Sequence, residues 1–187
     1  SSQLQWVSEK DKGQTDAINK GLRIASGEIV AYLNADDLLL PGTLLKIAQL
    51  FMEHPQTMWI TGQCRIIDEN NQEIRKLITA YKNLWLRLSH PSILLITDYI
   101  SQPATFWRAN LMSEMGYLDE SLHYAMDYEY WLRLAQGHGE RLVDHDMLAL
   151  RQRRAGQYGM HRIGRGDDDQ VDARIGKCGF GFGDYLH

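Results

Sequence analysis

The chain has 187 residues, of which 44% are hydrophobic and 24% are charged, and its formal net charge is -4. This composition predicts one soluble globular domain, or most of one, and excludes a disordered chain and a broadly basic surface for nucleic acid. The lack of a long apolar run or a signal-peptide pattern predicts a cytoplasmic location, with membrane association as the alternative. Most of the 16 glycines follow position 136, whereas all 4 prolines precede position 104, so the two ends of the chain differ.

The first elements alternate between helix and strand. Apolar spacing predicts a helix over residues 14–26 and a short buried strand over residues 28–33. The strand ends at the acidic loop Asn34-Ala35-Asp36-Asp37, and Pro41 then opens a helix that ends before residue 54. This order of strand, loop and helix is that of an α/β unit.

The second half of the chain continues the alternation with less regular spacing. The expected elements are paired strands at 58–67 and 73–78, helices at 81–88, 108–115 and 127–136, and strands at 102–107 and 141–150. The pattern decays after Leu150. We therefore expect a division into residues 1–150, a folded domain, and residues 151–187, an atypical glycine-rich tail.

Two adjacent carboxylates, those of Asp36 and Asp37, follow the first predicted strand. Like charges this close raise each other's pKa unless a cation offsets them. Carboxylate oxygens suit Mg²⁺ or Mn²⁺, which bind through one or two carboxylates together with substrate phosphates. The alternative is a solvated turn in which one of the aspartates caps the helix at Pro41.

Two further segments carry weaker signals. Asp11 and Lys12 precede the first helix, where backbone N–H groups and a lysine attract phosphate, although charged turns before helices are common. Asp127 opens a helix, so it is interpreted either as an N-cap or as a general base that faces a cleft. Spacing alone leaves both alternatives open.

Four ordered segments together resemble glycosyltransferase family 2. They are residues 8–21, residues 26–37 with the acidic loop, residues 102–106 (Gln-Pro-Ala-Thr-Phe), and residues 116–133 with Asp127. The resemblance covers the chain from about Trp6 to Leu150. It implies a GT-A fold, an α/β architecture with a mixed central sheet flanked by helices. It also implies inverting transfer of a sugar from a nucleotide-diphosphate donor to an acceptor hydroxyl, in the synthesis of a cell-surface polysaccharide or another glycan.

The resemblance also assigns roles to residues. It implies that Asp36 and Asp37 bind Mn²⁺ or Mg²⁺ and that Asp127 is the catalytic base. This sequence differs from the family pattern at two positions near these residues. Asn34 occupies a position where the family often has Asp, and Met126 occupies a position where the family usually has Glu.

The donor is assigned to a second group of residues. The resemblance implies that the nucleotide and donor sugar contact Asp11, Lys12, Asp36 and Gln102. Family members usually begin about two strands earlier, so we expect the first strands of the domain to be missing from this sequence. The alternatives are a non-catalytic binding or assembly module that keeps the fold, and a related nucleotidyltransferase.

The remaining candidates concern aromatic, basic and sulfur-containing residues. The predicted helix 81–88 mixes basic and apolar residues and is interpreted as core, with contact to a membrane that carries a lipid-linked acceptor as the alternative. Trp59 and Trp131 are expected in the core, whereas Trp85 or Trp107 could line an acceptor groove. Two cysteines exclude a disulfide framework, and no catalytic thiol is expected.

Overall fold

A computed structural model describes residues 7–88, 90–137 and 140–152. The elements in chain order are α1 (Gln14–Ile24), β1 (Ile29–Val30), β2 (Asp37–Leu39), α2 (Thr43–Glu53), β3 (Thr57–Ile67), α3 (Lys76–Leu88), α4 (Pro91–Leu94), the 3-10 helix η1 (Gln102–Ala104), β4 (Thr105–Arg108), α5 (Asn110–Met115), α6 (Met126–Gly137) and β5 (Glu140–Gln152). Residues 153–187, which make up most of the expected glycine-rich tail and include His161, Asp167–Asp169 and Cys178, lie outside this described part of the chain.

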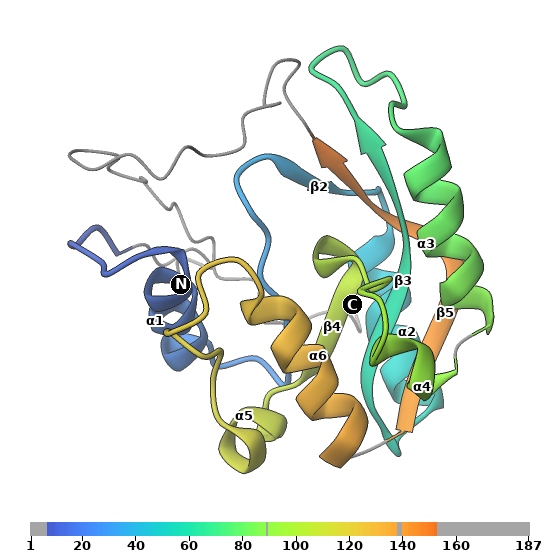
Figure 1. Cartoon of the computed structure of the whole chain (residues 1–187). Helices are drawn as coiled ribbons and strands as arrows, with labels where there is room; N and C mark the ends of the chain where they lie inside the picture. Colours follow the sequence, from blue (N-terminus) through green and yellow to red (C-terminus); the bar gives the residue numbers. More distant parts are fainter. Residues whose placement is uncertain (1–6, 89, 138–139, 153–187) are drawn as a thin grey trace, which may run out of the picture.

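The five strands form one mixed sheet, in the order β1-β4-β3-β5-β2 (Figure 1). Strands β3 and β5 are parallel, and the other pairs are antiparallel. The edge strand β2 pairs with the end of β5, and this register places Asp37 opposite Arg151. The expected α/β architecture, a mixed sheet flanked by helices, is confirmed.

Helices cover both faces of this sheet. Successive residues of a strand point to opposite faces, and Trp59 accordingly belongs to one core cluster while Ile60 belongs to the other. Helix α2 packs Ile47 and Phe51 into the Ile60 cluster. The larger Trp59 cluster receives side chains from α1, α3, α4, α5 and α6, so most helices lie on that face (Figure 1).

Tryptophan side chains occupy the centre of the larger cluster. Trp59 stacks on Trp131 with ring centroids 6.1 Å apart, and Trp107 meets Trp131 edge-on at 5.8 Å. The exposed fractions of Trp59, Trp107 and Trp131 are 1%, 0% and 0%. The expected core position of Trp59 and Trp131 is confirmed, and Trp107 does not line an acceptor groove because it is fully buried.

Two expectations about the local structure are wrong. The strand predicted at 73–78 is replaced by one isolated bridge between Glu73 and Ile67, after which α3 begins at Lys76. Positive φ angles at Asn71 (59°) and Arg75 (52°) turn the backbone away from a regular extended pairing. Helix α2 begins at Thr43, not at Pro41, because Gly42 adopts a left-handed conformation before it.

Candidate functional site

The acidic turn joins β1 to β2. It is closed by a hydrogen bond from the Asp37 N–H to the Asn34 carbonyl oxygen at 3.0 Å. Asp37 is buried, with 4% of its surface exposed, whereas Asp36 is exposed. Residue Gly42 holds the N-cap position of α2, with no side-chain cap. The alternative in which Asp36 or Asp37 caps that helix is therefore wrong.

Asn34 connects three elements through its side-chain amide. Its Nδ2 donates to Asp37 Oδ2 at 3.2 Å and to Gln102 Oε1 at 3.0 Å. Its Oδ1 accepts a hydrogen bond from Gln14 Nε2, at the start of α1, at 3.0 Å. An aspartate here could not donate to either oxygen, so the departure from the family pattern has a structural role at this position. Sequence reasoning noted the departure but missed these contacts.

Gln102 is the second connecting residue. It is buried in η1, and its Nε2 donates to the backbone carbonyl of Tyr32 while its Oε1 accepts from Asn34. The end of β1 and the acidic turn are thus both held against η1. Two predicted site residues, Asp37 and Gln102, therefore lie in one hydrogen-bonded group with Asn34 between them.

Tyr32, two residues before the acidic turn, has a buried hydroxyl. Within the described residues this hydroxyl has no hydrogen-bond partner. Burial raises the pKa of Tyr32 well above its ordinary value, and the negative charges of Asp127, Asp37 and Asp98 raise it further, while Arg151 opposes them. Carboxylates from three parts of the chain therefore act electrostatically on one phenol.

Asp127 lies in the first turn of α6, one residue after the helix begins at Met126. Its Oδ1 accepts from the N–H of Tyr128 at 2.8 Å, and the carbonyl of Ala125 accepts the first helical bond from Glu129. Asp127 therefore does not occupy the N-cap position, and that interpretation is wrong.

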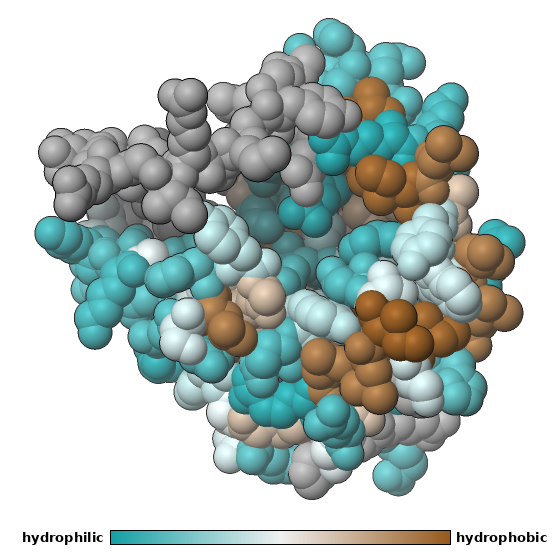
Figure 2. All heavy atoms as spheres, viewed as in Figure 1, coloured by the Kyte–Doolittle hydropathy of each residue, from teal (hydrophilic) through white to brown (hydrophobic). Residues whose placement is uncertain are grey.

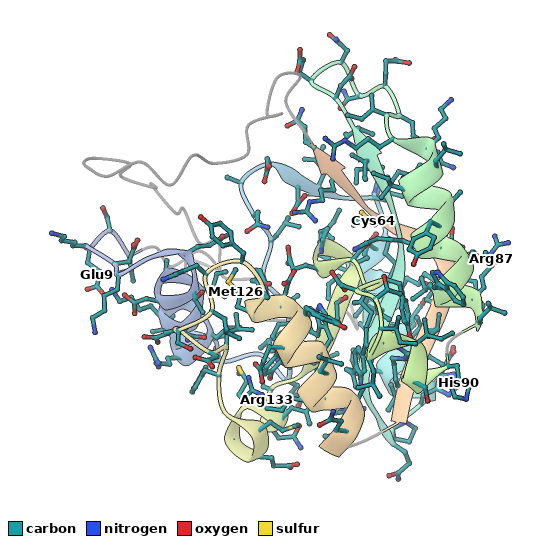
Figure 3. The ribbon with its side chains drawn as sticks, in the orientation of Figure 1. Glu9, Cys64, Arg87, His90, Met126 and Arg133 are labelled. Atoms are coloured by element: carbon teal, nitrogen blue, oxygen red, sulfur yellow. The ribbon has the colours of Figure 1, made fainter. Side chains whose placement is uncertain are left out.

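Met126, which stands where relatives usually have Glu, has a packing role. It is 7% exposed, and its sulfur accepts a hydrogen bond from Thr15 Oγ1 at 2.8 Å. Figure 3 shows Met126 at the start of α6, directed toward α1. This contact joins the helix that carries Asp127 to the helix that follows the predicted nucleotide segment.

Sequence reasoning missed Asp98, which lies near Asp127. Burial raises its pKa above the ordinary value, the positive charge of Lys82 opposes this, and the charge of Asp127 adds to it. Lys82 Nζ lies 3.5 Å from Asp98 Oδ2.

Burial raises the pKa of the Cys64 thiol to about 12. This buried cysteine therefore stays protonated at neutral pH, as expected for a residue without a catalytic role.

The predicted nucleotide segment precedes α1. Asp11 Oδ1 accepts from the Gly13 N–H at 3.0 Å, and Asp16 Oδ2 accepts from the Lys12 N–H at 2.9 Å. These contacts fix the turn and leave the Lys12 side chain exposed. A small hollow lies beside it, lined by Lys12, Gly13, Thr15, Asp16, Glu120 and His123. Because Gln14 contacts Asn34, this segment adjoins the acidic turn.

The carboxylate oxygens at the acidic turn are of the type that hard cations prefer. Within the described residues no group of three or more His, Cys, Asp or Glu side chains is arranged to hold a metal. Asp36 and Asp37 therefore offer one exposed and one buried carboxylate but no complete protein cage. Mg²⁺ and similar ions commonly bind through one or two carboxylates and complete their shell with phosphates and water. The residues fit a cation that arrives with a diphosphate.

Comparison with known proteins gives a family match. The model described as "Glycosyl transferase family 2" matches residues 7–112. An uncharacterized protein of Mycobacterium tuberculosis is 26% identical over 144 residues, which cover 71% of this chain and 45% of that protein. The uncharacterized glycosyltransferase YwdF of Bacillus subtilis is 23% identical over 135 residues, covering 72% and 49% respectively. The uncharacterized glycosyltransferase MJ1057 of Methanocaldococcus jannaschii is 23% identical over 145 residues, covering 76% and 48%.

The chain spans about half the length of these curated relatives. The residues matched by the family model include Asp11, Asp36, Asp37 and Gln102, whereas Asp127 follows them. The link between the start of α6 and this group, through Thr15 and Gln14 of α1, therefore comes from the tertiary structure.

Proposed function

Because the chain belongs to glycosyl transferase family 2, we propose that it forms part of an enzyme that transfers a sugar from a nucleotide-diphosphate donor to an acceptor hydroxyl. One observation carries this proposal. Helix α1 links the start of α6 to the acidic turn, because Met126 accepts a hydrogen bond from Thr15 and the neighbouring Gln14 donates one to Asn34. Asp37 and Asp127 therefore lie on connected elements although 90 positions separate them in the numbering. A diphosphate site and a general base at one location are what this transfer requires.

Asp127 is proposed as the general base. As the acceptor oxygen bonds to the anomeric carbon, its proton passes to the Asp127 carboxylate, and the bond from that carbon to the leaving diphosphate breaks. Attack from the face opposite the leaving group inverts the configuration. The contact of Asp127 with the Tyr128 N–H and the packing of Met126 on Thr15 support this role because they position the carboxylate.

The acidic turn is proposed to bind the donor diphosphate. Asp36 and Asp37 would hold Mn²⁺ or Mg²⁺, which when bound stabilises the negative charge that develops on the leaving diphosphate. Asn34 orients Asp37 through the 3.2 Å hydrogen bond, and Gln102 holds Asn34 in turn. Exposed Lys12, at the N-terminal end of α1, would attract a phosphate of the donor. We further propose that the acceptor belongs to a cell-surface polysaccharide or another glycan.

A thermal-shift experiment on the full-length protein tests donor binding. UDP and GDP are added with and without Mn²⁺, and at least one nucleotide is expected to raise the melting temperature more when Mn²⁺ is present. Asp36→Asn should reduce the Mn²⁺-dependent part. Glu53→Gln is the matched control, because this exposed carboxylate at the end of α2 is outside the hydrogen-bonded group of the acidic turn and should leave the shift unchanged.

Two outcomes would contradict the proposal. One is the absence of a shift with every nucleotide, which would favour a non-catalytic module. The other is an equal loss of the shift in Asp36→Asn and in Glu53→Gln, which would show that the acidic turn does not bind the donor.

A further inference from the structure

Helix α3 carries a stripe of exposed apolar side chains. Leu77, Tyr81, Leu84 and Leu88 recur at helical spacing, with exposed fractions of 87%, 47%, 54% and 58%. The opposite side of the same helix faces the core, where Leu86 is 2% exposed. Helix α3 is therefore apolar on two faces, and the described residues cover only one of them.

A neighbouring segment extends this surface. Leu95 and Ile96, directly after α4, are 61% and 84% exposed. Tyr81 Oη donates to Thr97 Oγ1 at 3.4 Å, which holds this segment beside α3. Figure 2 shows hydrophobic side chains gathered on the side of the molecule that α3 and α4 form in Figure 1. We call this surface the outer face of α3; its members are Leu77, Tyr81, Leu84, Leu88, Leu95 and Ile96.

The charge of this region is opposite to that of the whole chain. No aspartate or glutamate occurs between Glu73 and Asp98, whereas the chain as a whole has a net charge of -4. Lys76 and Arg87 are exposed on α3 and fall on one side of the apolar stripe. Figure 3 shows Arg87 directed away from the body of the molecule. Lys82 instead turns toward Asp98 and donates to the Ile100 carbonyl at 3.1 Å, so it belongs to the interior side.

We propose that the outer face of α3 docks on an anionic lipid surface. Exposed leucines beside lysine and arginine are typical of helices that lie in the interfacial plane of a bilayer, where apolar side chains enter the acyl boundary and basic ones meet the headgroups. No described helix is long and apolar enough to cross a bilayer. A second copy of the chain is a poorer occupant, because it would bring the basic residues of two α3 helices together, whereas anionic headgroups complement them.

The docked face would adjoin the proposed base. Tyr128, the residue after Asp127, donates its hydroxyl hydrogen to the Leu94 carbonyl at the end of α4, at 2.6 Å. The start of α6 is thereby fixed against the segment that enters the outer face. An acceptor held in the membrane would approach Asp127 from this side; that consequence rests on the proposed function, whereas the docking itself does not.

Vesicle flotation of the full-length protein tests the proposal. The vesicles contain phosphatidylcholine alone or a mixture of phosphatidylcholine and phosphatidylglycerol, and binding is expected to the mixture, with a decrease at high salt. The double variant Leu84→Gln/Leu88→Gln should lose about tenfold or more of its partitioning, because two leucines no longer enter the bilayer. Leu45→Gln is the control, since Leu45 is 49% exposed on α2, on the other face of the sheet.

The charge contribution is tested separately. Lys76→Gln/Arg87→Gln should remove most of the preference for phosphatidylglycerol while leaving the circular dichroism spectrum and the nucleotide thermal shift unchanged. The proposal would be overturned if the wild type did not bind the mixed vesicles, or if Leu45→Gln lowered binding as much as the α3 double variant. It would also be overturned if light scattering showed a dimer that Leu84→Gln/Leu88→Gln dissociates while vesicles bind neither protein, because a second copy would then be the occupant. A retained nucleotide shift in any of these cases leaves the proposed function standing.

Discussion

Different interactions hold the tryptophan core and the acidic site together. In the core, Trp59, Trp107 and Trp131 are buried to 1% or less, and their indole nitrogens have no hydrogen-bond partner within the described residues. At the site, Asn34 and Gln102 join separate elements through directed hydrogen bonds. The core therefore depends on buried area and ring packing, and the site depends on polar geometry. Substitutions in the two regions should consequently change different measurements.

The largest effect on folding is expected from Trp131→Ala. Removing a ring that packs on Trp59, Trp107 and Tyr130 should lower the free energy of unfolding by about 3–5 kcal/mol. Urea denaturation followed by circular dichroism measures it, and Trp85→Ala, at a half-buried position on α3, should cost less. A small effect of Trp131→Ala would mean that the ring does not hold the core together.

Asp127→Asn should affect catalysis and leave folding intact. Loss of a general base typically lowers the rate by about 10²–10⁴-fold, because the acceptor proton then has no positioned acceptor group. The turnover rate with a sugar nucleotide measures this, alongside the urea midpoint and donor affinity, which should stay near the wild-type values. Preserved transfer combined with lost donor binding would contradict the role assigned to Asp127.

Asn34→Asp should destabilise the site without disturbing the core. The new carboxylate cannot donate to Asp37 or Gln102 and places a like charge beside Asp37, at a cost of about 1–3 kcal/mol in unfolding free energy. Asn110→Asp, at the exposed start of α5, is the control, and its urea midpoint should stay close to that of the wild type. If the two variants behaved alike, the bridging role of Asn34 would be wrong.

The smallest expected effect is the pH dependence carried by Asp98. Burial raises its pKa in the folded state, so the folded protein binds this proton more tightly than the unfolded chain. The resulting stabilisation is present below the ordinary pKa of aspartate and is lost as the pH rises through the raised value. The urea midpoint of the wild type should therefore fall as the pH rises between the ordinary and the raised pKa of Asp98. Asp98→Asn should make this fall smaller, and Glu53→Gln should leave it unchanged. A slope identical to the wild type would exclude Asp98 as the cause.

Elements with a strong local pattern were predicted well from the sequence. The predicted bounds of helices α1 and α6 and of strands β3 and β5 are close to the observed ones. The local spacing of apolar residues is sufficient to predict these four elements. The strand predicted at 73–78 does not form, because the backbone turns at Asn71 and Arg75 although the composition of the segment is typical of a strand. The acidic turn was found because its carboxylates are adjacent in the chain.

The sequence by itself determined the α/β architecture and the acidic turn, and its resemblance to the family supplied the candidates Asp36, Asp37, Gln102 and Asp127. Only the tertiary structure decided that Asn34 joins Asp37 to Gln102, that α1 links this group to the start of α6, and that Asp98 pairs with Lys82. It also decided that α3 exposes Leu77, Leu84 and Leu88 while it buries Leu86. The physical reason is the same in each case: a periodic pattern shows that a side chain is apolar or polar, but the contacts that cover or pair it come from distant parts of the chain.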